Sequence, residues 1–474
     1  MDTIYVKNGI SKKAICDFLI NERDNCLTEI HAFSVIRRGE LLCRFALPPY
    51  ETTDCKQLFS LSKSFCSTAV GFAVDEGLFK VTDRIIDIFP ECCPEVISER
   101  LAKMTVHNAL TMGTGHGSCA MNVMIYSDNP VRAFMEKELV YEPGEKFVYN
   151  TGATLLLSII VQKFTGKTVY DYLYEKLFRF LDNYPEKWDV IPAGYCEGGV
   201  GLYAAVRDIE NLGMLYLGKG ILNGKRYLSE EWVEMATSKQ ISNDGNGSPD
   251  WCAGYGYQFW RNSREGFRGD GAFGQYCFVL PESEIVVAVQ CECTSAMQSE
   301  LDGVFEYLGH IDDADDMTDA EFEAFIKGFY TPEKCEIGGF AGFGNKYALS
   351  DNAHNVKYVE FIRDGEKIDI NLIGLSGRQT ISAGNGEYIT SSADLRAFKP
   401  TLNGLVPVRL EECRVACYVA ECTENALTLK VRYRNAPQTE TITFTEKDGR
   451  VEILYGCKTG NVIEEAKGIY GKLL

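Results

Sequence analysis

The sequence predicts a mixed α/β domain followed by an all-β domain, and three observations support this fold class. Strand-like runs occur near residues 30–50 and again near 275–293, with helix-like segments between them. The segment 152–165 is apolar nearly all round, which is typical of a deeply buried helix. After about residue 335, strand-like runs alternate with turn residues to the end of the chain.

The length and charge of the chain narrow its function. A chain of 474 residues is long enough for roughly two to three domains. The net charge of −19 and the pI of about 4.9 argue against nucleic acid and against anionic membranes as partners, since both attract basic surfaces. The N-terminal region has no uninterrupted apolar stretch of the kind that directs export or spans a bilayer. We therefore expect a cytoplasmic protein with a small-molecule substrate, and an oligomer is compatible with this.

The first elements are two strands and a helix. The runs HAFSVIRRG and LLCRFALPP alternate in polarity and are joined by a turn at Arg38–Gly39. Residues 60–77 follow as a helix, because Phe65, Ala69 and Phe72 recur at the spacing of one buried face and Gly77 is a natural stop.

The later elements complete the first domain and define the second. We predict helices at 152–165 and 229–238, the strands YCFVLPE and EIVVAVQCE, and a helix in SAMQSELDGVFEYLGH. An acidic helical connector covers 311–331. Asp-Gly pairs at 364–365 and 448–449 are typical of hairpin turns. The predicted domains are therefore 1–310 and 332–474.

Eighteen cysteines are many, but they lie scattered through core-like segments, so we expect reduced thiols that pack as small apolar side chains. Cys413, Cys417 and Cys422 cluster in a strand-like stretch without a nearby histidine, which disfavours a zinc site. The glycines of 338–344 precede no helix pattern, which disfavours a phosphate loop. We predict no metal or organic cofactor.

The stretch LFSLSKSF at 58–65 places Ser60 and Lys63 one helical turn apart. A serine hydroxyl is a weak nucleophile until a base removes its proton. A lysine on the same helix face, partly desolvated and close to the positive end of the helix, has a lowered pKa and can act as that base. In isolation the spacing favours a serine that caps a helix and a solvated lysine, so the surrounding sequence must decide.

That surrounding sequence resembles the class C β-lactamase and penicillin-binding-protein-like serine hydrolases over roughly residues 30–310. The matching segments are FSLSKSFCSTAVGFAVDEG, KVTDRIIDIFPE, MTVHNALTMGTGHG, YEPGEKFVYNTGATLLLSIIVQKFTGK, GGVGLYAAVRDIENLGMLYLGKGILNGKRYLSEEW, GYGYQFW and GDGAFGQYCFVLPE, in the family's order. The resemblance implies a β-lactamase-like antiparallel sheet flanked by helices, with a helical lobe beside it. Residues 332–474 resemble the barrel-like domain that many members carry, expected near the cleft or in oligomer contacts.

The resemblance also implies the site. Ser60 matches the acylated serine, Lys63 the motif lysine and Ser62 the small residue between them. Tyr149 matches the tyrosine that moves a proton between nucleophile and leaving group, and we expect Lys63 to lower the pKa of this tyrosine. The oxyanion would lie between the amide of Ser60 and an amide near residues 271–273. The alternative for Tyr149 is a buried tyrosine with one hydrogen bond.

Two departures from the family pattern affect the predicted substrate. The motif asparagine is replaced by Thr151, although Asn150 stands beside it and either side chain could contact substrate. The basic third motif is replaced by the stretch FRGDGAFGQY, in which Asp270 or Gly266 takes the basic position. An acidic residue there disfavours substrates that carry a carboxylate.

Further substrate-binding candidates are Arg268, Asp270, Gly271 and Ala272, together with His116. Arg268 and Asp270 could equally form a strand-end ion pair, and His116 could be a structural donor.

The leading hypothesis is a serine hydrolase that cleaves an ester or amide, among them β-lactams and D-amino-acid peptides, through an acyl-enzyme. The alternatives are an acyltransferase that uses the same acyl-enzyme and a catalytically impaired penicillin-binding-like module.

Overall fold

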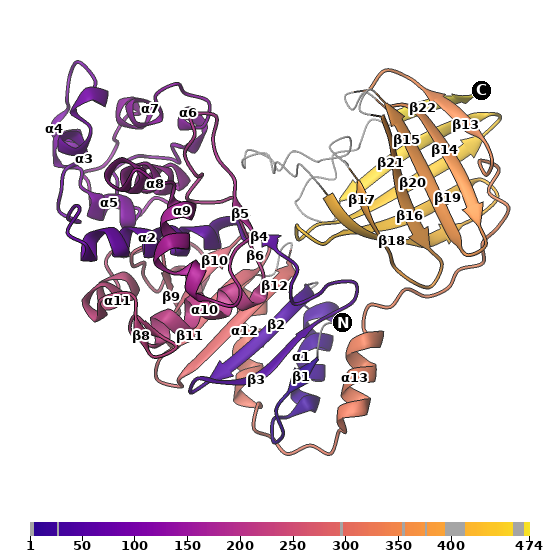
Figure 1. The fold of residues 1–474 in the computed structure, drawn as a ribbon, viewed down its shortest axis with the longest axis horizontal. Coiled ribbons are helices and arrows are strands. Elements are labelled where there is room, and N and C mark those ends of the chain that lie inside the picture. Colours follow the sequence, from indigo (N-terminus) through magenta and orange to yellow (C-terminus); the bar gives the residue numbers. More distant parts are fainter. Residues whose placement is uncertain are drawn as a thin grey trace.

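The computed structural model describes residues 4–25, 28–293, 297–352, 356–374, 377–393, 413–457 and 469–474. Its first domain contains a sheet with helices on both faces and a helical lobe, and a β-barrel follows (Figure 1). This is the fold class that the sequence predicts. The boundaries at residues 310 and 332 stay predictions.

The main sheet has seven antiparallel strands in the order β1-β3-β2-β12-β11-β10-β9. In sheet order the strands are β1 (Tyr5–Val6), β3 (Glu40–Ala46), β2 (Glu29–Arg37), β12 (Ile285–Glu292), β11 (Gln275–Leu280), β10 (Phe267–Gly271) and β9 (Trp260–Arg261). The predicted hairpin at Arg38–Gly39 joins β2 to β3, and both residues have positive φ. The central strands β2 and β12 come from distant parts of the sequence, so the sheet ties the two ends of the domain together.

Each face of the main sheet carries its own apolar layer. Alternation along β2 directs Phe33 and Val35 to one face and Ala32 to the other. The Phe33 face is covered by α1 (Lys12–Asp24), α12 (Met297–Gly309) and α13 (Asp319–Gly328). The connector predicted at 311–331 contains α13, whose Phe322 and Ile326 pack into this layer.

The opposite face of the sheet is covered by α10 (Val206–Leu217) and by the helical lobe. The helices of the lobe are α2 (Ser62–Asp75), α3 (Ile85–Ile88), α4 (Glu99–Lys103), α5 (Val106–Leu110), α6 (Met121–Met124), α7 (Pro130–Glu136), α8 (Thr151–Thr165), α9 (Val169–Lys176) and α11 (Glu230–Thr237). Short 3-10 turns are η1 (Phe59–Leu61), η2 (Pro90–Cys92), η3 (Phe178–Phe180) and η4 (Pro249–Trp251). Small sheets are formed by β4 (Lys56–Gln57), β6 (Leu202–Ala204) and β5 (Lys187–Trp188), and by β7 (Ile221–Leu222) and β8 (Lys225–Arg226).

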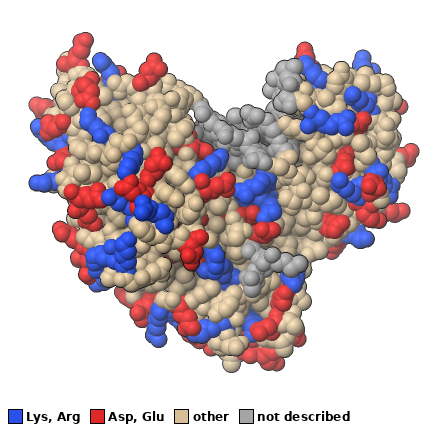
Figure 2. Space-filling view, in the orientation of Figure 1, with Lys and Arg blue, Asp and Glu red and all other residues tan. Residues whose placement is uncertain are grey.

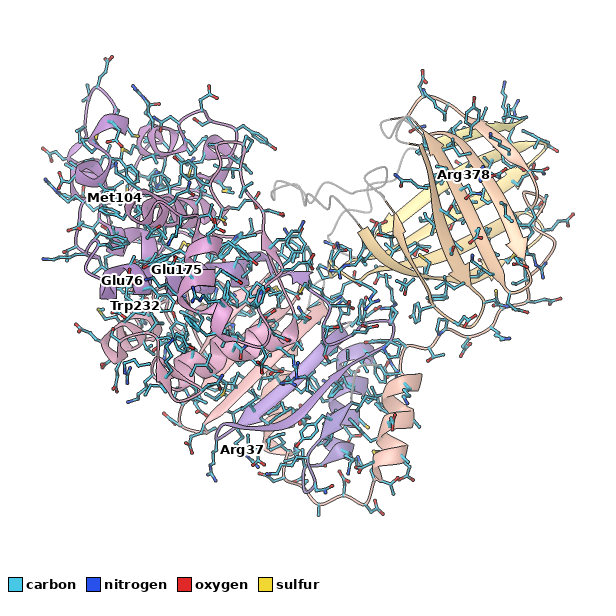
Figure 3. The ribbon with its side chains drawn as sticks, viewed as in Figure 1. Arg37, Glu76, Met104, Glu175, Trp232 and Arg378 are labelled. Atoms are coloured by element: carbon cyan, nitrogen blue, oxygen red, sulfur yellow. The ribbon has the colours of Figure 1, made fainter. Side chains whose placement is uncertain are left out.

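Helix α2 lies at the centre of the first domain. Every residue from Ser62 to Ala73 is buried. Trp232 of α11, labelled in Figure 3, packs so closely against Gly71 that a Cβ at that glycine would lie 2.4 Å from the indole nitrogen. Of the described helices, none is long and apolar enough to cross a membrane.

The C-terminal domain is a ten-stranded sheet that closes on itself. The strands are β13 (Lys346–Leu349), β14 (Val356–Asp364), β15 (Lys367–Gly374), β16 (Gly377–Gly384), β17 (Ile389–Ala393), β18 (Cys413–Cys422), β19 (Ala426–Tyr433), β20 (Thr439–Lys447), β21 (Arg450–Cys457) and β22 (Ile469–Leu473). The parallel pairing of β16 with β18 closes the barrel. Both predicted Asp-Gly turns join neighbouring strands, β14 to β15 and β20 to β21.

The barrel contacts the first domain through charged groups and backbone around the loop between β19 and β20. Arg434 forms two hydrogen bonds to Asp54, at 3.0 and 2.7 Å. Arg432 pairs with Glu29, and both side chains are largely buried. The backbone amide of Thr439 donates to Glu292 at 3.0 Å. On the face drawn in Figure 2, acidic and basic side chains are interspersed over both domains.

The fifteen cysteines whose side chains are described are all free, and most are buried. Of the predicted cysteine cluster, Cys417 and Cys422 lie in the apolar core of the barrel. The side chain of Cys413 lies outside the described residues.

The contact between the domains yields the first prediction. Arg432→Ala should lower the free energy of unfolding by about 3 kcal/mol or more, because it removes the cationic partner of Glu29 from a buried contact. The measurement is chemical unfolding followed by fluorescence. Arg414→Ala is the matched control, since Arg414 and Glu186 form an exposed pair that contributes less than about 1 kcal/mol. Equal shifts in the two variants would contradict the prediction.

Candidate active site

Ser60 lies in the 3-10 turn η1, directly before α2 begins at Ser62. The sequence pattern predicts Ser60 at the start of the helix itself, but in the structure Ser60 lies in this tighter turn. The preceding residue, Phe59, has φ +48°, which is rare for a bulky side chain and marks a strained backbone. The turn therefore holds Ser60 at a sharp entry into a buried helix.

Lys63 lies one turn beyond Ser60 and directs its amine back to it. The Lys63 Nζ donates to Ser60 Oγ at 3.0 Å, to Thr151 Oγ1 at 3.2 Å and to the Gly199 carbonyl at 2.8 Å. The side chain is almost completely buried, and this burial lowers the pKa of Lys63 to about 7. At neutral pH a large fraction of this amine is therefore uncharged and has a lone pair that can accept a proton.

Tyr149 completes the group. The Lys63 Nζ lies 4.9 Å from the centre of the Tyr149 ring, and the ring stacks on Trp260 with centroids 5.5 Å apart. Contrary to the expected lowering, the pKa of Tyr149 is raised, because burial outweighs a hydrogen bond with Ser60 that acts in the opposite direction. Tyr149 is therefore a neutral phenol, which can donate and accept protons at the same oxygen.

Thr151 and Asn150 have different places in the structure. Thr151 begins α8 and its hydroxyl accepts a hydrogen bond from Lys63. Asn150 is fully buried, and its Oδ1 accepts from the amides of Gly152 and Ala120 at 3.1 and 2.8 Å. Asn150 thus caps α8 and ties it to the neighbouring loop. Of the two candidates, the structure brings Thr151 to Ser60 and Lys63.

Arg268 and Asp270 form a buried ion pair on β10. Arg268 Nε donates to Asp270 Oδ2 at 2.9 Å, and Arg268 Nη1 also donates to the carbonyl of Asp250. The guanidinium lies 4.6 Å from the centre of the Trp251 ring. Burial raises the pKa of Asp270, and its two cationic neighbours, Arg268 and Lys63, act in the opposite direction. Arg268 and Asp270 therefore form the ion pair that the sequence offered as the alternative to substrate binding.

Gly271 and Ala272 lie next to the turn that carries Ser60. A Cβ on Gly271 would lie 2.1 Å from the Leu58 carbonyl and 3.1 Å from the Leu61 amide, so the backbone of β10 approaches residues on both sides of Ser60. Ala272 follows directly and is partly exposed. An amide near residues 271–273 stays the predicted second donor to an oxyanion, beside the amide of Ser60.

His116 is buried away from solvent in a chain of hydrogen bonds. Its Nδ1 lies 2.9 Å from Thr114 Oγ1, and its Nε2 lies 3.1 Å from the Phe134 carbonyl. Burial lowers the pKa of His116 to about 4, so the ring is neutral. This geometry matches the structural-donor alternative for His116.

Three groups near the nucleophile were not predicted from the sequence. They are the Gly199 carbonyl, Trp260 and Phe273, whose ring meets Phe59 edge-on with centroids 5.0 Å apart. Gly199 lies in a segment that carries the family resemblance, so that signal was available. Trp260 and Phe273 also lie in matching segments, GYGYQFW and GDGAFGQYCFVLPE, but only the three-dimensional structure brings their rings to the site.

Among the described residues, the one group close enough to share a metal ion is Glu29, His31 and Glu292, with ligand atoms within 4.8 Å of one another. It lies at the contact with the barrel. Arg432 already pairs with Glu29, and the Thr439 amide already donates to Glu292. These bonds occupy carboxylate oxygens that a metal ion would need.

Comparison with known proteins supports the fold described above. The 6-aminohexanoate-dimer hydrolase of Paenarthrobacter ureafaciens is 26% identical over 280 residues, which are 54% of this chain and 71% of that protein. The octameric penicillin-binding protein homologue from Pyrococcus abyssi has a TM-score of 0.51 at 17% identity, covering 97% of this chain and 99% of that one. EstCE1, a hydrolase with promiscuous acyltransferase activity, has a TM-score of 0.53 at 13% identity, covering 62% and 97%.

The profile of the family described as Beta-lactamase matches residues 31–303, which are more than half of the chain. The matched stretch contains Ser60, Lys63 and Tyr149, together with strand β10. It confirms the resemblance noted from the sequence motifs. This chain belongs to the Beta-lactamase family.

Proposed function

We propose that this protein is a serine hydrolase that cleaves an ester or amide through an acyl-enzyme on Ser60. The observation that carries the proposal is the buried amine of Lys63, 3.0 Å from Ser60 Oγ and with a pKa lowered to about 7. A base with a pKa near the working pH combines a usable lone pair with sufficient proton affinity.

The proposed reaction has two stages. Ser60 Oγ attacks the substrate carbonyl carbon while its proton passes to Lys63, and the amides of Ser60 and Ala272 stabilise the oxyanion. The bond to the leaving group then breaks, and the proton reaches the leaving alcohol or amine through the Tyr149 hydroxyl. Water next attacks the acyl carbon. A proton of this water returns through Tyr149 and Lys63 to Ser60 Oγ, and the acid and free Ser60 are released.

The raised pKa of Tyr149 fits this relay. A phenol that stays protonated can accept a proton from Lys63 as it passes its own to the leaving group, so no phenolate accumulates. Thr151 and the Gly199 carbonyl fix the amine of Lys63 in place during both stages.

The substrate class follows from β10. We take Asp270, and not Gly266, as the residue at the family's basic position, and Arg268 Nε is already bonded to its carboxylate. A substrate carboxylate at this edge would therefore meet an adverse charge. We expect neutral or cationic esters and amides to be preferred over β-lactams.

Acyl transfer stays the alternative, because the same acyl-enzyme can react with an alcohol or amine in place of water. EstCE1, which shares the fold, is named for this activity. The octameric homologue from Pyrococcus abyssi supports an oligomer for this chain as well. We place the protein in the cytoplasm, as the sequence predicts.

Ser60 should be the residue that reacts with an active-site fluorophosphonate. Labelling of the wild type at Ser60, read by peptide mass spectrometry, is expected to be stoichiometric, and Ser60→Ala should show none. Tyr149→Phe should slow labelling by about a hundredfold, because the proton relay is lost. Wild-type protein that is not labelled, with no turnover of any ester or amide, would favour the catalytically impaired module.

The rate of acylation should rise with pH through about 7. Lys63 becomes a base only when it loses its proton, so its neutral fraction and the rate increase about tenfold between pH 6 and pH 8. Lys63→Arg should lose the activity, since arginine keeps its charge. Lys56→Met is the matched control, because burial also lowers the pKa of Lys56 to about 7 at the domain contact. A profile that changes in Lys56→Met but persists in Lys63→Arg would overturn the assignment.

A substrate panel tests the role of position 270. A p-nitrophenyl ester, a D-amino-acid amide and nitrocefin should be turned over in decreasing order, with nitrocefin at least about tenfold below the ester. A pair of esters that differ only in methylation of one remote carboxylate isolates the charge effect, and the methylated ester should be preferred. Added methanol or hydroxylamine reveals transfer if the acyl group appears on the acceptor. Preference for the free carboxylate would contradict the substrate class.

A further inference from the structure

The turn that follows β10 carries the second amide of the proposed oxyanion site, and buried groups on another element hold this turn from behind. We propose that Glu300 of α12 and Cys291 of β12 are positioning residues that fix the turn 271–274, and with it the Ala272 amide, opposite Ser60. This inference rests on the proposed function, because it assigns a role to the same oxyanion site.

The front of the turn contacts the nucleophile segment. Phe273 has φ +65° and its ring meets Phe59, which has φ +48° and directly precedes Ser60. Two residues with left-handed backbone therefore pack against each other at the two sides of the oxyanion site. Such conformations persist only where the surrounding structure holds them, so the turn needs support from its other side.

The back of the turn rests on a thiol and a carboxyl. Cys291 Sγ lies 2.8 Å from Glu300 Oε1 and 3.0 Å from the Gly274 carbonyl. A Cβ on Gly274 would lie 2.1 Å from Cys291 Sγ and 2.8 Å from Glu300 Oε1. The thiol–carboxyl pair therefore fills the space where a side chain at residue 274 would stand.

Further hydrogen bonds converge on one carbonyl of the turn. The Phe273 carbonyl accepts from the Cys293 amide at 3.1 Å and from Gln275 Nε2 at 3.2 Å. Gln275 Nε2 also donates to the Cys291 carbonyl at 2.7 Å. These hydrogen bonds connect the peptide group between Phe273 and Gly274 to Cys291 of β12 and to Cys293, just beyond the end of β12.

The state of Glu300 suits a site behind an oxyanion. The side chain is fully buried, and burial raises its pKa, with Asp270 acting in the same direction. Cys291, Cys293 and Tyr276 act on the pKa of Glu300 in the opposite direction, but burial outweighs them. A protonated carboxyl keeps its hydrogen bonds without placing a negative charge behind the developing oxyanion.

Stability alone does not account for a carboxyl at this position. Glu300 lies on the helix that covers the Phe33 face of the sheet, beside the buried apolar residues Leu301 and Val304 of the same helix. Burial of a carboxyl in such a layer costs free energy unless its oxygens are used. Cys291 of β12 uses one of these oxygens, Oε1, at 2.8 Å.

The test compares two substitutions at residue 300. Glu300→Ala should lower kcat for a p-nitrophenyl ester about tenfold to a hundredfold and change KM by less than about threefold, since the amide is misplaced in the transition state. Glu300→Gln keeps an acceptor oxygen in a neutral side chain and should stay within about threefold of wild type. The rate of fluorophosphonate labelling of Ser60 should follow kcat. Glu306→Ala, an exposed change on the same helix, should leave both rates unaltered.

Cys291→Ala removes the other half of the contact without adding a buried charge, and it tests the proposal if Glu300→Ala does not fold. The same selective loss of kcat is expected. Unchanged kcat in folded Glu300→Ala or Cys291→Ala overturns the inference. It is also overturned if Glu300→Gln loses as much kcat as Glu300→Ala and its melting temperature falls by the same amount. Wild-type protein that is not labelled at Ser60 refutes the proposed function instead, so the two failures are distinguishable.

Discussion

The burial of one amine against one hydroxyl is the constraint on which the site depends. Lys63 is a side chain that water would keep charged, yet the helix that carries it is buried from Ser62 to Ala73. The protein compensates with three hydrogen-bond acceptors, among them Ser60 Oγ, and leaves the amine with a lowered proton affinity. The same burial that costs stability lowers the pKa of Lys63, and such perturbed groups are common where a fold is adapted to chemistry.

The site draws on three layers of the first domain. The helical lobe supplies Lys63, Tyr149 and Thr151, and the main sheet supplies the backbone of β10. The helix layer on the far side of the sheet reaches the site through Glu300. Close approach is possible because Gly271 has no side chain, so β10 meets the backbone beside Ser60, and because Gly274 leaves room for the side chains of Cys291 and Glu300.

Most of the fold could be predicted from the sequence, since period and turn signals are local. The hairpin at 38–39, helix α8 and both Asp-Gly turns were predicted correctly. The placement of Ser60 in a 3-10 turn was not, because it depends on the contact with β10. The direction of the Tyr149 pKa was predicted wrongly, since burial is a property of the packed structure and not of the motif. Phe59 and Phe273 meet across more than two hundred residues, a juxtaposition that no spacing rule reveals.

The contacts between the barrel and the first domain determine whether the two domains could be separated. Strand β4, at Lys56–Gln57, ends two residues before η1 begins, and the Gln57 amide donates to the Asn435 carbonyl of the barrel. Lys56 is fully buried there over the Tyr50 ring and donates to the Tyr433 carbonyl. Severing the two modules would open this lysine and Asp54 to water within a few residues of the nucleophile. The C-terminal domain thus covers the segment that leads to Ser60, and buried contacts join the two domains there.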